Sequence, residues 1–329
     1  MHSTIRDNAG NHSILKKHSG DVLTFFLTLA IFTIPVLWRS DYIIFIASLF
    51  AVHAIIVMAL NITNGYMGML NLSVAGQVGL GAYAAALLAE AGLSLPSVII
   101  ATMMLGALVG AFIFLIFCRL SGFFLGLGTI AAAEAIRLLI RNFDGITGGM
   151  RGLGDFPPIA GDNFSMYILA CVSCLVVFIM TTVLVRSEIG LRWRAVRENE
   201  GKAKALGFNV FLIKLSTFTF VGAIMTFGGG LLALIIRFID PNIAGLNYLI
   251  EYVIMLAAGG PGTIVGPLLG SFFITVVPEV LRVAPEFRMI IYGAVLILLV
   301  LRFPGGIAGI FTKAPARSPS EAKQNSSAG

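Results

Sequence analysis

The chain alternates long apolar runs with short polar stretches. Ten runs stand out, at residues 22–38, 42–60, 65–91, 95–117, 122–140, 166–185, 215–236, 246–258, 266–280 and 287–301. About 20 apolar residues cross a ~30 Å hydrocarbon core as a helix. The runs are continuously apolar and do not alternate as barrel strands do, so we expect helices. The pattern predicts an all-α polytopic membrane protein with about ten transmembrane or partly re-entrant helices.

The longest charged interruption runs from Arg186 to Lys214 and reads RSEIGLRWRAVRENEGKAKALGFNVFLIK. It is longer than a connection between two helices requires, which indicates a docking surface. We expect an amphipathic helix that ends at Gly207. It either inserts Ala205 and Leu206 into a groove on a partner protein or lies against anionic lipid, and these residues alone favour neither reading.

Charge predicts the topology, because basic residues gather in cytoplasmic loops. With the 186–214 stretch inside, six runs precede it and four follow, so both termini are cytoplasmic. The domains are then a cytoplasmic N-terminal segment (1–21), a transmembrane domain (22–303) and a cytoplasmic, disordered tail (304–329). The 143–165 loop falls outside, where Asp144, Asp155 and Asp162 outnumber Arg151.

Composition narrows the class of protein further. Hydrophobic residues make up 58% and charged residues 12% of the chain, against about 25% charged in soluble domains. The net charge of +6 is spread over short loops, which argues against nucleic-acid binding. The sequence contains no phosphate-binding loop, metal-binding motif or catalytic set. We therefore expect no enzyme activity, no metal and no cofactor in this chain.

Polar and small residues within the apolar runs are the candidates for a transport path. Amides and glycines are unfavourable on a lipid-facing helix, so they either pack closely or line a path. The run 65–91 contains several of them. We expect three runs to be broken or re-entrant: 65–91, 246–258 and 266–280. Small residues at GxxxG spacing, Gly106/Gly110 and Gly266/Gly270, favour tight helix packing over a substrate site.

Ionisable residues in the runs are costly in lipid and so have a reason to be there. Glu134 and Arg137 lie three residues apart, which predicts an internal ion pair, with a substrate contact as the alternative. Glu251 has three equal readings: a pair with Arg237, a contact with a binding protein, or a place beside the path. For His53 we expect a packed ring bonded to a backbone carbonyl.

The stretch Gly190 to Asn209, with its R-E-N-E and A-x-A-L-G pattern, resembles the coupling loop of permease subunits of branched-chain amino acid (Liv-type) ABC importers. In that family the pattern G-R-x-x-x-A-I-R-E-N-E-x-x-A-x-A-x-G contacts the ATPase. Lys202 and Lys204 make this loop more basic than the family pattern. The resemblance implies these coupling residues: Arg194, Arg197, Glu198, Asn199, Glu200, Ala203, Ala205 and Gly207.

Three further blocks resemble the same family in the same order: GYMGMLNLS with GLGAY (65–83), AEAIRL with TGG (133–149), and EYVIM with GGPGT (251–263). They imply a set that lines or packs around the path: Asn71, Ser73, Gln77, Gly79, Gly81, Glu134, Arg137, Glu251, Gly259 and Gly260. They also imply a side that faces a binding protein: Thr147, Gly148 and Gly149. Val74 stands where the family often has His or Gln, which weakens any substrate assignment from that helix.

The resemblance implies a permease subunit of a bacterial inner-membrane importer for branched-chain or related amino acids. Its partners would be a second permease subunit, two ATPase subunits that hold ATP and Mg²⁺, and a periplasmic binding protein. A related importer for urea or short amides is the nearest alternative. An ion-coupled secondary transporter is a different class, and it would need acidic or amide residues that converge at mid-membrane.

Overall fold

The computed structural model describes residues 40–154, 156–157, 161–280 and 306–311. Within them, five helices are long and apolar enough to cross a membrane. They are α2 (Asp41–Asn61) with its continuation η1 (Ile62–Tyr66), α4 (Leu95–Phe117), α5 (Gly122–Asn142), α7 (Asn163–Arg186) and α10 (Val210–Ile236). Three shorter apolar helices are α3 (Val74–Glu90), α11 (Leu246–Gly259) and α12 (Gly266–Val280).

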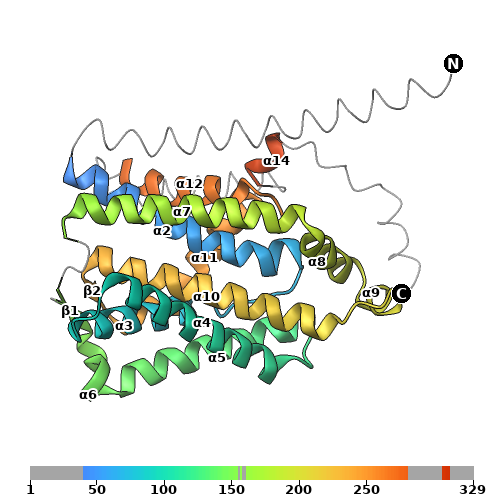
Figure 1. Ribbon diagram of the computed structural model, residues 1–329, viewed down its shortest axis with the longest axis horizontal. Coiled ribbons are helices and arrows are strands. Elements are labelled where there is room, and N and C mark those ends of the chain that lie inside the picture. The colour runs from blue at the N-terminus through green and yellow to red at the C-terminus, as the bar shows by residue number, and fades with distance from the viewer. Residues whose placement is uncertain (1–39, 155, 158–160, 281–305, 312–329) are drawn as a thin grey trace.

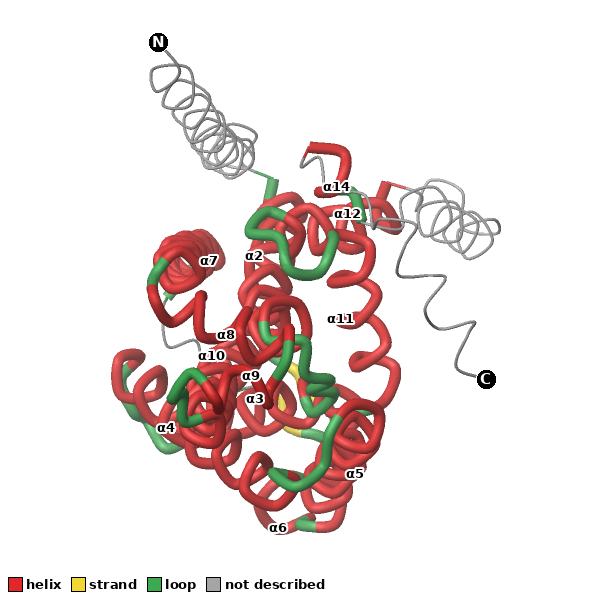
Figure 2. Tube along the Cα trace, turned by 90° about the vertical axis from the view of Figure 1, so that its right-hand side faces the viewer, coloured by secondary structure: helices red, strands yellow, loops and turns green. Residues whose placement is uncertain are grey.

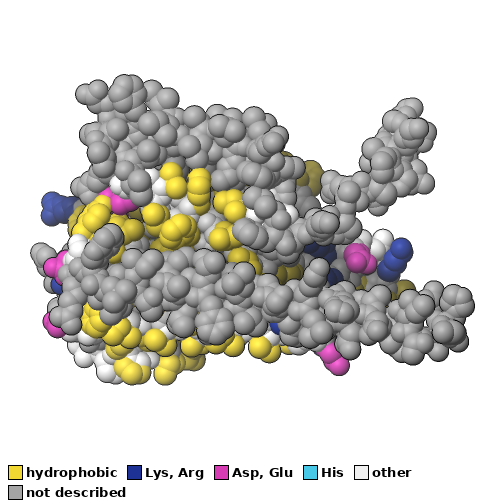
Figure 3. Space-filling view, turned by 90° about the horizontal axis from the view of Figure 1, so that it is seen from above, with side chains coloured by type: hydrophobic (Ala, Val, Ile, Leu, Met, Phe, Trp, Pro, Cys, Tyr) yellow, Lys and Arg dark blue, Asp and Glu magenta, His cyan; other side chains and the backbone are white. Residues whose placement is uncertain are grey.

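The prediction of an all-α polytopic protein is confirmed at this level. Eight of the ten apolar runs fall on these helices, and runs 22–38 and 287–301 lie outside the described residues. The total of about ten therefore stays a prediction. In Figure 3, the described side chains that are visible between the grey regions are mostly hydrophobic, and most of the charged ones lie toward the two ends. This is expected for a chain surrounded by lipid.

Short elements collect at the two opposite ends of the bundle (Figure 1). One end carries α8 (Glu188–Glu198) and α9 (Glu200–Ala205). The other carries α6 (Asp144–Thr147), η2 (Gly149–Arg151), η3 (Pro241–Ala244) and the antiparallel pair β1 (Leu153–Gly154) and β2 (Phe238–Ile239), while the four-residue α14 is Ala308–Phe311. Residues 143–154 and the helices α8 and α9 thus lie at opposite ends of the spanning helices.

Helix α10 packs against α2, α3 and α4, and the view along the bundle in Figure 2 places α4, α5, α7 and α11 toward its outside. The contacts of α10 with α3 and α4 include close approaches of backbone to backbone. A Cβ added at Gly106 would lie 2.4 Å from the carbonyl oxygen of Gly222, and one at Gly229 would lie 2.0 Å from that of Val78. Real Cβ atoms do not come so close, so these helices meet at this distance only because glycine lacks a side chain.

The predicted packing role of the small residues is confirmed at several positions. A Cβ at Gly110 would lie 2.3 Å from the carbonyl oxygen of Phe218, one at Gly266 2.4 Å from that of Gly260, and one at Gly270 1.8 Å from that of Met255. Gly79 and Gly81 pack in the same way, against Ala244 and Thr226.

The run 65–91 is broken, as the sequence allowed. Helix α2 ends in the π-helix η1, residues 67–73 are non-helical, and α3 then covers only 17 residues. Helices α11 and α12 have 14 and 15 residues. At 1.5 Å per residue each is roughly 21 to 22 Å long, short of a ~30 Å core. They are antiparallel, because Gly259 contacts Gly266 and Met255 contacts Gly270.

We expect that Gly106→Val destabilises the fold by about 1–3 kcal/mol, because the new side chain forces α4 away from α10. The measurement is thermal unfolding of the detergent-solubilised protein, followed by size-exclusion chromatography. Gly145→Val is the matched control, since a Cβ there meets nothing within 4 Å. Equal unfolding temperatures for the two variants would show that the contact is not close.

Candidate functional site

The charged segment, residues 187–209, contains two helices and not the single amphipathic helix that we predicted. Residues 210–214 of the charged stretch already belong to α10. Asn199 breaks the segment, because its backbone is extended (φ −166°, ψ 112°) between α8 and α9. Its side-chain oxygen accepts a hydrogen bond from the Lys202 amide at 2.9 Å, which is the ordinary role of asparagine at a helix N-terminus. Ser187 caps α8 in the same way, through the amide of Ile189.

The predicted helix end at Gly207 is confirmed. The Phe208 amide donates to the Ala203 carbonyl at 3.1 Å and the Gly207 amide to the Lys204 carbonyl at 3.0 Å, the pair of bonds that defines a Schellman end. Gly207 has φ 87°, a conformation that favours glycine. The preceding Leu206 is 74% exposed, so it extends from the molecule as an apolar tip.

Three side-chain contacts hold the charged segment to the bundle. The Trp193 indole nitrogen donates to the Thr217 hydroxyl of α10 at 2.8 Å. The Arg197 guanidinium donates to the Gly65 carbonyl at the end of η1 at 2.7 Å. Lys214 of α10, whose side chain is 9% exposed, forms an ion pair with Glu200. The segment is therefore fixed at once to α10 and to the end of α2.

The eight predicted coupling residues differ in whether they contact the bundle or face solvent. Arg197 and Glu200 contact the bundle, and Ala203 is buried. Ala205, Gly207 and Glu198 are exposed. Arg194 bonds within the segment, to the Gly190 carbonyl at 3.2 Å. Arg194, Arg197 and Asn199 are exposed as well, and Glu200 is partly exposed. Of the eight residues, only Ala203 is buried from a partner at this end of the molecule.

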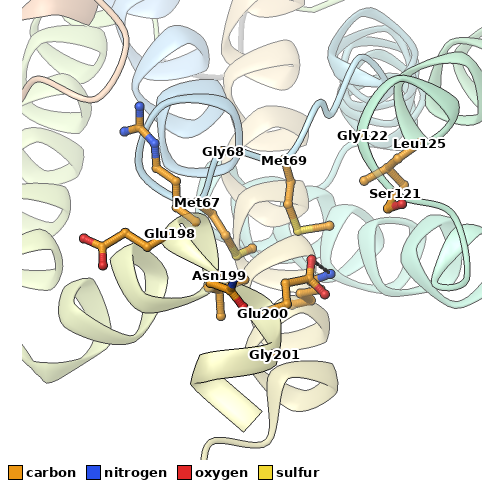
Figure 4. A pocket seen from close by; sticks show the side chains of 13 residues that line it. Met67, Gly68, Met69, Ser121, Gly122, Leu125, Glu198, Asn199, Glu200 and Gly201 are labelled. Atoms are coloured by element: carbon orange, nitrogen blue, oxygen red, sulfur yellow. Dashed lines mark hydrogen bonds and ion pairs between the residues drawn. The ribbon is translucent and has the colours of Figure 1, made fainter. Parts of the chain in front are cut away.

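A cavity of about 420 Å³ lies under the charged segment (Figure 4). Residues 196–201 and Lys214 line one side, and the 67–69 loop and the first turn of α5 line the other. The side chains of Met67 and Met69 point toward Asn199 and Glu200 across it (Figure 4). The cavity is thus bounded by both the segment and the break that precedes α3.

Across that break and the first turn of α3, three predicted path residues form one buried hydrogen-bonded chain. Ser73 Oγ donates to Asn71 Oδ1 at 2.7 Å, and Gln77 Nε2 donates to Ser73 Oγ at 2.8 Å. All three are fully buried. Within the described part of the chain, Asn71 Nδ2 and Gln77 Oε1 have no hydrogen-bond partner, so one free donor and one free acceptor remain at the ends. Each such group costs about 1–3 kcal/mol.

Backbone carbonyls and side chains both bond the non-helical backbone of 67–73. The amides of Met67 and Met69 donate to the carbonyls of Ile62 and Thr63. The Leu72 amide donates to Thr129 Oγ1 at 2.9 Å and the Asn71 amide to Asn64 Oδ1 at 3.0 Å.

The tip of the α11–α12 hairpin is fastened to α2 through Asn61, whose side-chain Nδ2 donates to the Thr263 carbonyl at 2.8 Å. Gly260 there has φ 111°, and Gly259 lies against Gly266. Both glycines therefore allow the tight turn between α11 and α12.

The predicted Glu134–Arg137 ion pair is confirmed. Arg137 Nε lies 3.0 and 2.9 Å from the two carboxylate oxygens, and the pair is partly exposed. The pairing of Glu251 with Arg237 is wrong, because Arg237 donates to Asn163 Oδ1 at 3.4 Å and no ion pair joins it to Glu251. The other two readings of Glu251 stay predictions.

His53 is buried as predicted, but its partner differs. Its Nδ1 lies 3.0 Å from the Thr275 hydroxyl, so a side chain of α12 takes the place of the expected backbone carbonyl. The ring also lies edge-on to Tyr252, with centroids 5.9 Å apart. His53 therefore helps to fasten α12 and α11 to α2.

Thr147, Gly148 and Gly149 fix the backbone of a tight turn. Thr147 is 8% exposed, and its hydroxyl lies 2.5 and 2.8 Å from the carbonyls of Ile140 and Phe143. Gly148 and Gly149 both have positive φ. The neighbours Ile146 and Met150 are the exposed ones, at 60% and 66%. Sequence reasoning missed them, because two apolar residues in a loop carry no signal of their own.

Spanning helices, a charged segment fixed across one end of them, and a buried polar chain leading away from it define a polytopic transport permease. Within the described residues no group of three or more His, Cys, Asp or Glu side chains is arranged to hold a metal. Residues 42–300 match the family described as branched-chain amino acid transport system / permease component. The chain belongs to this family.

Individual relatives agree with that assignment. The branched-chain amino acid permease LivM of Escherichia coli K12 is 26% identical over 292 residues, which cover 80% of this chain and 69% of LivM. LivM of Salmonella typhimurium is 26% identical, over 85% of this chain and 73% of its own length. The autoinducer 2 import permease LsrC of Salmonella typhi is 27% identical, over 72% and 70%. No solved structure matches.

We expect Lys214→Glu or Glu200→Lys alone to loosen the charged segment, because each leaves a charge without its partner. A lost charge-assisted bond is worth about 1.5–3 kcal/mol, or at least about tenfold in opening. Hydrogen–deuterium exchange of the α8 and α9 amides should rise by that factor, and the double swap should restore protection. Lys204→Glu, an exposed matched control, should change nothing. Equal exchange in all variants would show that the ion pair does not hold the charged segment in place.

Proposed function

We propose that this chain is a transmembrane permease subunit of a bacterial ABC importer for branched-chain or related amino acids. ATP and Mg²⁺ would be bound by two separate ATPase chains. A second permease subunit and a periplasmic binding protein would complete the assembly. The observation that supports this most is an exposed apolar tip on a charged segment that is otherwise fixed to the bundle interior.

The tip is the contact proposed for the ATPase. Ala205 and Leu206 are exposed, and Lys202 and Lys204 surround them with positive charge. Protein interfaces usually have an apolar centre that is surrounded by a polar rim. This assignment places the charged segment, and with it both termini, on the cytoplasmic side of the inner membrane.

The inward contacts would transmit the movement. A displacement of α9 reaches α10 through Glu200 and Lys214, and reaches the end of α2 through Arg197 and the Gly65 carbonyl. The segment, α10 and the end of α2 would therefore move as one body. The first turn of α5, on the other side of the 420 Å³ cavity, has no such attachment among the described hydrogen bonds and ion pairs, so the cavity would widen or close.

That cavity would be the cytoplasmic exit. The 67–73 break leads from it to the Asn71–Ser73–Gln77 chain, and the free donor and acceptor at the ends of that chain match the carboxylate and ammonium of an amino acid. At the opposite end, Ile146 and Met150 would give the periplasmic binding protein apolar contacts. The assignment of aliphatic amino acids follows the LivM relatives, and the LsrC relatives define the competing substrate to be tested.

The test is uptake by proteoliposomes that contain the permease pair, the ATPases and the binding protein. We expect ATP-dependent uptake of labelled leucine that excess isoleucine or valine suppresses and that urea or autoinducer 2 does not. Leu206→Glu should lower uptake and ATPase co-purification at least about tenfold, because it places a charge in a desolvated contact.

Leu93→Glu is the control, since Leu93 is an exposed apolar residue in the loop between α3 and α4. Uptake without ATP in a proton gradient would contradict the importer class. Normal ATPase recovery with Leu206→Glu would place the coupling contact elsewhere.

A further inference from the structure

A second cavity lies at the end of the bundle opposite the charged segment, where α2 and α7 begin and α10 ends (Figure 1). Its volume is about 260 Å³. Pockets for drug-sized ligands run from about 300 to 1,000 Å³, so this one fits a smaller molecule. None of the residues discussed above as path residues lines it.

Two opposite charges line this cavity, the carboxylate of Asp41 and the guanidinium of Arg237. Among the described ion pairs none joins them, so both remain available across the cavity. Arg237 Nη2 donates to Asn163 Oδ1, which also lines the cavity. At 3.4 Å this bond is long, and the other guanidinium donors are left for a ligand.

The backbone of Arg237 is unusual for its residue type. It has φ 60°, and no other non-glycine residue in the described ranges has a positive φ. It ends α10, with its amide donating to the Ala233 carbonyl at 2.8 Å. Glycine is the common choice for this position, and an arginine is strained there. Strain of this kind is concentrated at functional sites, which makes Arg237 a candidate for a ligand contact.

The remaining walls of the cavity are mostly apolar. They are contributed by Ile44 and Phe45 of α2, Met166 of α7, and Leu234 and Ile235 of α10. Ser48 also lines it, and its hydroxyl already donates to the Ile44 carbonyl at 2.7 Å. The cavity thus combines one anion, one cation and an aliphatic surface.

We propose that this cavity binds a free α-amino acid with an aliphatic side chain. Arg237 holds the carboxylate, since the guanidinium fork pairs with both carboxylate oxygens. Asp41 holds the ammonium group, and the side chain lies against the apolar walls. The substrate class rests on the proposed function, but the site is separate from the path and lies at the outer end, where it would receive the amino acid on entry.

The test is direct binding of labelled leucine to the permease complex in lipid nanodiscs, with no binding protein present. Arg237→Gly is the decisive variant, because glycine suits the left-handed backbone while the guanidinium is lost. We expect its thermal stability to be maintained or raised and its Kd for leucine to rise at least about tenfold. Asp41→Asn should lose the preference for leucine over 4-methylpentanoate, which lacks the amino group.

Arg151→Gln, at the same end of the bundle and exposed, should bind leucine as the wild type does. Unchanged leucine binding by Arg237→Gly, or no saturable binding by the wild type, would overturn the site. Leucine uptake by the complete system separates the two proposals. Absent uptake contradicts the proposed function, whereas normal uptake with Arg237-independent binding contradicts only this site.

Discussion

The backbone contact of α10 with α3 and α4 is the constraint on which the other features depend. Glycines at 81, 106, 222 and 229 allow carbonyl oxygens to occupy the space where side chains would be. In lipid no hydrophobic force drives helices together, so association relies on such close packing. Because α10 is fixed in this way, the groups at its two ends have fixed places: Lys214 and Thr217 under the charged segment, and Arg237 beside the 260 Å³ cavity at the opposite end.

The same packing permits a non-helical stretch inside the bundle. Backbone groups in hydrocarbon must be satisfied internally, and residues 67–73 have neither a helix nor a strand to do so. Thr129 and Asn64 accept hydrogen bonds from two of their amides, and the carbonyls of Ile62 and Thr63 accept from two more. The cost of this arrangement is a buried polar chain with two unsatisfied ends. A permease that moves a polar molecule has a use for such groups, whereas a purely structural bundle does not.

Local features were predictable from the sequence. The apolar runs, the glycine spacing, the i,i+3 pair Glu134–Arg137 and the end at Gly207 depend on residues close together in the chain. The break at Asn199 was missed because R-E-N-E reads equally well as continuous helix, and only the extended backbone of Asn199 separates α8 from α9. Long-range partners were out of reach. Arg197 lies 132 residues from Gly65, and Arg237 lies 74 residues from Asn163, so no sequence pattern links them.

The movement proposed for the charged segment and α10, as one body relative to the start of α5, can be measured directly. It is tested by distances between spin labels in the assembled transporter, with the native cysteines replaced. One pair joins Leu191 to Leu212, and the other joins Leu191 to Phe124, all exposed side chains. We expect ATP binding to leave the Leu191–Leu212 distance unchanged and to shift the Leu191–Phe124 distance. A shift in the first distance as large as in the second would contradict the proposed movement.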